Sequence, residues 1–89
     1  MTTLRLPRPL WEYADGAREL SVAQPTLREA LHELKRRHPL VYDRILTEQG
    51  NIREHVNIFV NRALVRDPDK SDPLKAGDTI TVLPAISGG

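Results

Sequence analysis

The side chains of this sequence that could act in catalysis or bind a metal include three histidines. His32, His38 and His55 are scattered along the chain, and none has a carboxylate or a second histidine at ligand spacing on a shared face. A metal site or an acid–base pair needs partners that converge on one point. We therefore interpret the three as surface histidines, and we expect no catalytic residue and no metal site.

The serines and aspartates also lack the sequence context of a reactive site. A serine nucleophile sits in a glycine-flanked turn, and no serine of this chain has that context (Ser21, Ser71, Ser87). Four aspartates suggest calcium, but their spacing misses the EF-hand pattern, its central glycine is absent and two prolines intervene (Asp67, Asp69, Asp72, Asp78). Aspartate and proline at this density are typical of turns.

The remaining unusual feature is the ending LPAISGG, residues 83–89. It follows an apolar strand pattern directly and finishes on two glycines. On composition alone, a frayed terminus explains such an ending. The ending therefore indicates a function only if the elements before it support one.

Length and composition restrict the classes of protein to consider. The chain has 89 residues, enough for one domain with one core, with 39% hydrophobic and 28% charged residues. A formal net charge of +1 gives no electrostatic reason to expect a nucleic-acid partner. The absence of cysteine excludes disulfides, thiolate metal sites and thiol nucleophiles. We see no signal peptide or membrane span, so we expect a cytoplasmic protein with no membrane partner.

The hydrophobic pattern predicts strands and one main helix. Alternating residues predict strands at 2–7, 18–22, 56–61 and 79–84, with a short strand at 63–65. Residues 26–39 predict an amphipathic helix, with Thr26 and Glu29 at capping-box spacing. Residues 40–46 predict a short helical turn that covers the core.

One amphipathic helix across one face of a mixed sheet is the economical arrangement of these elements. The expected fold is therefore α+β, a β-grasp (ubiquitin-like) roll. We expect a domain over residues 1–84 and a flexible C-terminal tail over residues 85–89.

Two apolar side chains are predicted to lie on the open face of this sheet. If Val56, Ile58 and Val60 face the helix, the pleat places Phe59 on the opposite face. The same count along the last strand places Leu83 there. An exposed aromatic beside an exposed leucine suggests a docking patch. Isolated exposed apolar residues are also normal, so periodicity alone leaves both interpretations open.

Taken together, the element order and two motifs resemble the MoaD/ThiS family of ubiquitin-like sulfur carriers. The family has a V-N at the end of its third long strand, matched here by Val60-Asn61. It also has a GD that opens a last strand finishing in P-x-x-x-GG, matched by Gly77-Asp78 through Gly89. The resemblance covers essentially the whole chain. Its details look closest to the carriers that serve cysteine biosynthesis (CysO-like).

The resemblance implies a sulfur carrier that is acted on by enzymes and is not itself an enzyme. An activating enzyme would use ATP to adenylate the carboxylate of Gly89, the expected true terminus, and sulfur would convert it to a thiocarboxylate. Gly88 and Gly89 carry no side chain, which suits entry into a narrow active site. Phe59 and Leu83 would dock on the partner, and Ile86 would sit in its channel. ATP would belong to the partner, with no cofactor bound stably here.

The implied partners are an adenylating enzyme and a downstream synthase that accepts the sulfur, and we expect a monomer when the protein is free. Three alternatives stay open. The first is a ubiquitin-like modifier joined to other proteins through Gly89, and the second is the small subunit of a molybdopterin synthase. The third is a β-grasp interaction domain with an inert tail.

Overall fold

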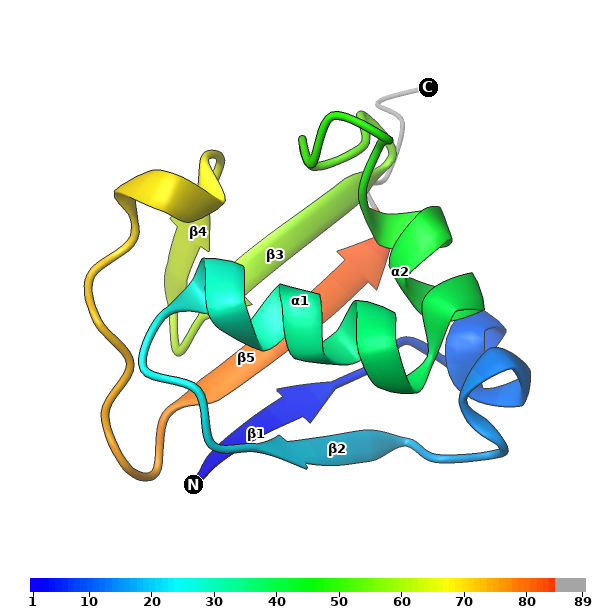
Figure 1. Ribbon diagram of the computed structural model, residues 1–89, viewed down its shortest axis with the longest axis horizontal. Coiled ribbons are helices and arrows are strands. Elements are labelled where there is room, and N and C mark those ends of the chain that lie inside the picture. The colour runs from blue at the N-terminus through cyan, green and yellow to red at the C-terminus, as the bar shows by residue number, and fades with distance from the viewer. Residues whose placement is uncertain (85–89) are drawn as a thin grey trace.

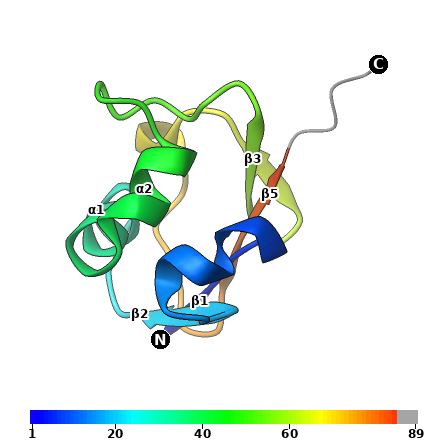
Figure 2. The ribbon, with the colours of Figure 1, turned by 90° about the vertical axis from the view of Figure 1, so that its right-hand side faces the viewer.

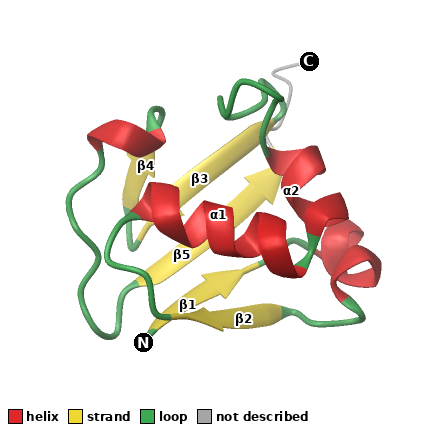
Figure 3. Ribbon diagram, in the orientation of Figure 1, coloured by secondary structure: helices red, strands yellow, loops and turns green. Residues whose placement is uncertain are grey.

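The structure is a computed structural model that describes residues 1–84. Its strands and helices follow in the order β1 (Thr2–Arg5), η1 (Arg8–Ala14), β2 (Glu19–Val22), α1 (Leu27–Arg37), α2 (Pro39–Ile45), β3 (Val56–Val60), β4 (Ala63–Val65), η2 (Pro68–Lys70) and β5 (Thr79–Pro84). Here η denotes a 3₁₀ helix. The order of the strands and the main helix is the one predicted from the sequence (Figures 1 and 3).

The five strands form one mixed sheet in the order β2-β1-β5-β3-β4. β1 and β5 are parallel at its centre, and the other neighbouring pairs are antiparallel. Helices α1 and α2 lie on the same side of the sheet, and within residues 1–84 no α-helix covers the other side (Figure 2). This is the predicted α+β β-grasp arrangement, with α1 packed across one face.

Helix α1 forms where its capping and its apolar stripe predicted it. The hydroxyl of Thr26 accepts a hydrogen bond from the amide of Glu29 at 3.1 Å, which is the hydroxyl half of the predicted capping box. Basic residues fill the last turn, where they complement the helix dipole, and Pro39 begins the next helix. The apolar stripe is completely buried (Leu27, Ala30, Leu31, Leu34).

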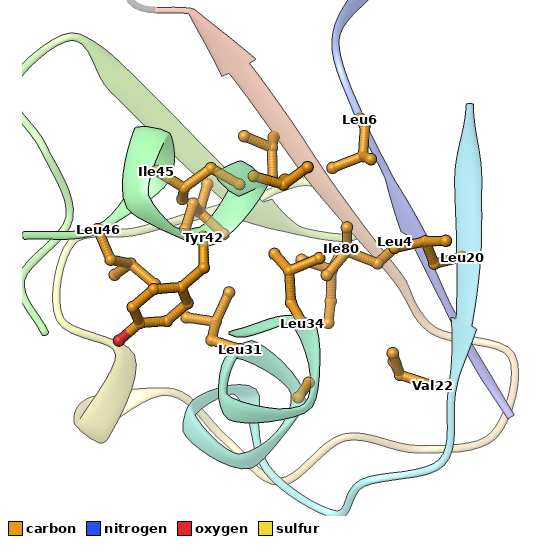
Figure 4. Close-up of a cluster of buried hydrophobic side chains, with 14 of the residues drawn as sticks. Leu4, Leu6, Leu20, Val22, Leu31, Leu34, Tyr42, Ile45, Leu46 and Ile80 are labelled. Carbon is orange, nitrogen blue, oxygen red and sulfur yellow. The ribbon is translucent and has the colours of Figure 1, made fainter. Parts of the chain in front are cut away.

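The hydrophobic core fills the space between these helices and the sheet (Figure 4). The sheet contributes inward residues at alternate positions of each long strand (Leu4, Leu20, Val22, Ile58, Ile80, Val82). Helix α2 and the residue after it contribute Val41, Tyr42, Ile45 and Leu46, so the predicted helical turn does cover the core. The alternate apolar residues of the strands predicted at 2–7, 18–22 and 79–84 are buried (Leu4, Leu6, Leu20, Val22, Ile80, Val82). Val56 and Val60, which were expected to face the helix from β3, are half-buried.

The connection between β1 and β2 contains a 3₁₀ helix, η1, where the sequence suggested only a connection. Pro7 precedes the first residue of η1 and Pro9 supplies a fixed φ in its first turn, so the prolines permit a helix here. The indole of Trp11 donates to the carbonyl of Leu6 at 2.8 Å and anchors η1 to the end of β1. The guanidinium of Arg18 lies 4.6 Å from the centre of the Trp11 ring and forms a cation–π contact with it.

One arginine of α1 connects this helix to η2 and to the loop that contains Gly50. Arg28 forms a two-bond ion pair with Asp69, at 2.8 and 3.1 Å, and donates to the carbonyl of Gly50 at 2.7 Å. This contact raises the pKa of Arg28 and lowers the pKa of Asp69, mainly through the shared hydrogen bonds. Gly50 has a φ of +83°, and a Cβ there would lie 3.0 Å from the guanidinium.

Over residues 1–84, no helix has the length and apolar character needed to cross a membrane.

Candidate functional site

Strand β5 leads to the C-terminal residues that the sequence analysis singled out. Pro84 is the last residue that the structure describes, and it pairs with Val56 of β3. Ile86, Gly88 and Gly89, with the rest of the expected tail, lie outside the described residues. The described part of the site therefore ends at Pro84, the last residue of β5.

The register of β3 and β5 places Phe59 and Leu83 on the helix-free face of the sheet, as predicted. Ile58 is paired with Val82, and both side chains are buried on the helix side. The neighbouring pairs, Phe59 with Thr81 and Asn57 with Leu83, therefore point the other way. Phe59 and Leu83 are thus diagonal neighbours, within reach of an aromatic side chain.

Phe59 is half-buried, which corrects the expectation of an exposed aromatic. Leu64 of β4 lies directly opposite Phe59 and is itself 41% exposed, while Leu83 is 43% exposed. Leu64 was not among the residues predicted for this surface. The signal was available, because a two-residue turn at Asn61-Arg62 pairs Val60 with Ala63 and therefore Phe59 with Leu64. We call Phe59, Leu64 and Leu83 the apolar patch.

The two motifs that carried the family resemblance meet at the other end of β5. The side-chain amide of Asn61 donates to Asp78 at 3.1 Å, and its oxygen accepts from the amide of Thr79 at 3.0 Å. The backbone amide of Asn61 also donates to the carbonyl of Thr79 at 2.7 Å. Asn61 has a φ of +55°, a left-handed conformation that asparagine tolerates better than most residues. We call these contacts the Asn61–Asp78 latch.

The second half of the latch is a turn closed by the Asp78 carboxylate. Its other oxygen accepts from the amide of Lys75 at 2.8 Å, and Gly77 between them has a φ of +88°. The Lys75 amide, followed by the Asn61 side chain, holds the pKa of Asp78 below its ordinary value. Both motifs therefore fix the β3–β4 hairpin against the start of β5.

The candidate metal and acid–base residues do not converge. Within residues 1–84, no group of three histidines, cysteines or carboxylates could hold a metal ion. His32 and His55 are exposed, and His38 is the residue between α1 and α2. Asp67 accepts from the amide of Asp69 at 2.9 Å as the cap of η2, as expected for turn chemistry. The described part of the chain thus carries an apolar patch on the open face of its sheet, next to the strand that ends at Pro84.

Comparison with known proteins identifies similar chains. The ThiS family profile matches residues 4–89. The sulfur carrier protein CysO of Mycobacterium tuberculosis is 28% identical over 90 residues, covering 98% of this chain and 97% of its own.

Solved structures agree with this result. The matching chain in the crystal structure of the Amycolatopsis orientalis BexX/CysO complex is 28% identical, with a TM-score of 0.84 and full coverage of both chains. SAMP1 from Haloferax volcanii is 27% identical, with a TM-score of 0.74, and the match covers 99% of this chain and 98% of that one.

Proposed function

The chain belongs to the ThiS family, and from that premise we propose that it is a sulfur carrier that is loaded at the carboxylate of Gly89. The observation that carries the proposal is the match over residues 4–89, which includes the Gly88-Gly89 ending together with the sheet that precedes it. Similarity to CysO over nearly the whole of both chains supports the same role and a link to cysteine biosynthesis.

The chemistry begins with a carboxylate that is a poor acyl donor. In the proposed first step, the Gly89 carboxylate attacks the α-phosphorus of ATP on an activating enzyme, and pyrophosphate leaves. A sulfur nucleophile then attacks the carbonyl carbon of the acyl adenylate, and AMP leaves to give the thiocarboxylate. The thiocarboxylate sulfur is later passed to an acceptor on a second enzyme. In this scheme ATP is held by the activating enzyme.

This chain contributes a handle and a docking surface to that scheme. The apolar patch lies on the open face of the sheet, and Leu83 is on the strand that leads directly to the tail. A partner that covers Phe59 and Leu83 would therefore hold the point from which residue 85 departs. We assign docking to these side chains, a place in the partner's channel to Ile86, and the reacting end to Gly88 and Gly89. The protein is then a cosubstrate, and general acids and bases belong to its partners.

A second candidate function shares the first step. SAMP1 of Haloferax volcanii is a small archaeal modifier protein and is similar to this chain. By that similarity, the adenylated Gly89 carboxylate would form an isopeptide bond with a lysine of another protein. The two functions differ in their product, which is transferable sulfur in one case and a covalent conjugate in the other.

Top-down mass spectrometry tests the proposal directly. The purified protein is incubated with ATP, sulfide and the cognate adenylating enzyme, and the C-terminal fragment is examined for replacement of one oxygen by sulfur. Localisation to that fragment is essential, because oxidation of Met1 or Trp11 changes the intact mass by nearly the same amount. A variant without Gly88 and Gly89 is the control.

Sulfur on Gly89 that is absent from the control supports the carrier function. Conjugates to lysines without thiocarboxylate support the modifier function. An unchanged C-terminal fragment in a reaction that contains active enzyme would contradict both.

A further inference from the structure

The parallel ladder between β1 and β5 ends before either chain segment leaves the sheet. Its last pair is Arg5 with Thr81. Beyond that level β1 continues on its other side, where the amide of Leu6 donates to the carbonyl of Arg18 at 2.9 Å. Strand β5 likewise continues to Pro84 by pairing with β3. A local cause must therefore stop the pairing between these two neighbours.

The hydrogen-bond phase of the ladder identifies the groups that its next step would use. The amide of Thr3 donates to the carbonyl of Asp78 at 3.0 Å, so odd-numbered residues of β1 bond even-numbered residues of β5. The step after Arg5 would therefore need one N–H donor at position 7 and one at position 84. Both positions are proline, which has no N–H. The ladder stops at the first step for which neither strand has a donor.

Helix η1 then leads the chain away from β5 at this level. Pro7 is still extended, with a φ of −71° and a ψ of 153°, but its carbonyl already accepts from the amide of Leu10 at 2.9 Å. In the described part of the chain, Leu83 and Pro84 pair with β3 and have no partner on β1. We call Leu83 and Pro84 the root of the tail.

We propose that Pro7 and Pro84 are positioning residues, which leave the root of the tail attached to the sheet along one side only. This inference rests on the proposed function, because it concerns how Gly89 reaches the reacting atoms. In that scheme the same end must fit two enzymes in turn, through the five residues 85–89. A misplacement of about 1 Å can cost about 100-fold in rate. A root that is held along one edge can adjust its direction to both sites.

A purely structural role of the two prolines makes a different prediction. Proline is common where a strand ends, because it cannot donate to the next step of a ladder. As simple strand ends, Pro7 and Pro84 would affect stability without affecting the reaction at Gly89. As positioning residues, they would affect the reaction in a protein that remains fully folded.

The test restores both donors with the variant P7V/P84V in the full-length protein. P84V alone restores one donor and provides a second variant with a smaller change to η1. The matched control is P25V/P73V, which removes two exposed prolines outside the strands. Thermal melting checks that each variant is folded. Hydrogen exchange followed by NMR reports on the new amides at positions 7 and 84, and kcat and KM are measured for thiocarboxylate formation with the cognate adenylating enzyme, ATP and sulfide.

We expect the two new amides of P7V/P84V to exchange at least about 10-fold more slowly than in the urea-unfolded protein, because they extend the ladder. One net hydrogen bond shifts an equilibrium by about 2- to 10-fold, so kcat should fall about 5- to 100-fold in P7V/P84V and about 2- to 10-fold in P84V. KM and the control variant should both stay within about 2-fold of the wild type, because the apolar patch is unchanged.

Added tail length distinguishes positioning from a general structural effect. Two glycines are inserted after position 84 in the wild type and in P7V/P84V. The additional length should replace the freedom that the tied root has lost, so the difference in kcat between these two proteins should shrink to about 2-fold. A difference in kcat that the glycines leave unchanged would overturn the inference.

Two other results would also overturn it. One is free exchange of the new amides, which would mean that the prolines do not stop the ladder. The other is protected amides with an unchanged kcat, which would retain the proposed function and reject the positioning role. A wild-type protein that forms no thiocarboxylate with an enzyme active on another carrier would reject both.

Discussion

Replacing Asn61 should show that the most recognisable motif of the sequence serves stability. Asn61→Ala removes two side-chain hydrogen bonds, to Asp78 at 3.1 Å and from Thr79 at 3.0 Å, and forces alanine into a φ of +55°. These hydrogen bonds are exposed, so we take the low end of the usual range, about 0.5 kcal/mol each. The left-handed conformation adds about 1 kcal/mol for a residue with a Cβ. The expected loss in unfolding free energy is therefore about 2 kcal/mol.

Asn61→Gly separates the two contributions. Glycine adopts a positive φ without strain, so this variant should lose only the hydrogen bonds, about 1 kcal/mol. Urea unfolding provides the measurement, with the slope unchanged and the midpoint lowest for Asn61→Ala. In thermal melts, about 4–8 °C should be lost per kcal/mol in a domain of this size.

Two results would refute this reasoning about the Asn61–Asp78 latch. One is an Asn61→Ala protein as stable as the wild type, and the other is Asn61→Gly being less stable than Asn61→Ala. The latch lies at the start of β5, whereas Pro84 is at its end. Below their melting temperatures, both variants should therefore form the Gly89 thiocarboxylate at the wild-type rate. A slower reaction of the folded variants would mean that the motif acts in the chemistry after all.

Three further changes test other contacts. Leu83→Ala should weaken binding to the activating enzyme about 5-fold. The control Leu40→Ala, on α2 and 54% exposed, should leave the affinity unchanged. Equal affinities of the two variants by calorimetry would remove Leu83 from the docking surface. Gly50→Ala should lower the free energy of unfolding in urea by about 1 kcal/mol more than Gly16→Ala does. Both positions have a positive φ, but only a Cβ at Gly50 would meet another residue. Equal losses of unfolding free energy would contradict this. The Asp78 carboxyl has a lowered pKa when folded, so its contribution is complete above the unfolded value of about 3.9 and is lost as pH falls through the folded value. The stability gap between wild type and Asp78→Asn should thus shrink at acid pH, and a gap that widens there would contradict the assignment.

Local patterns in the sequence were sufficient to predict the main elements. The capping residue Thr26 and the apolar stripe of 27–34 determine α1 through contacts within a few residues, and a period of two determines the inward side of β3. The same period identified Phe59 and Leu83 as members of the open face. These predictions needed no knowledge of how distant segments pair.

What the sequence analysis missed depends on contacts between distant segments. Phe59 is half-buried because β4 brings Leu64 beside it, and only pairing across the hairpin reveals this. Helix η1 is only seven residues long, and a hydrogen bond from the indole of Trp11 to the carbonyl of Leu6 fixes it to the rest of the domain. The ion pair of Arg28 with Asp69 joins residues 41 positions apart. Spacing along the chain cannot indicate such contacts.

The parallel pairing of β1 with β5 has a mechanical consequence. Thr3 is level with Thr79 and Arg5 with Thr81, so the two strands run side by side in the same direction at the centre of the sheet. A pull on the far end of β5, opposed at the start of β1, would load their backbone hydrogen bonds together in shear rather than one after another. An antiparallel pair pulled in the same way would open like a zipper. The domain should therefore resist mechanical unfolding when a partner enzyme pulls on its C-terminal end.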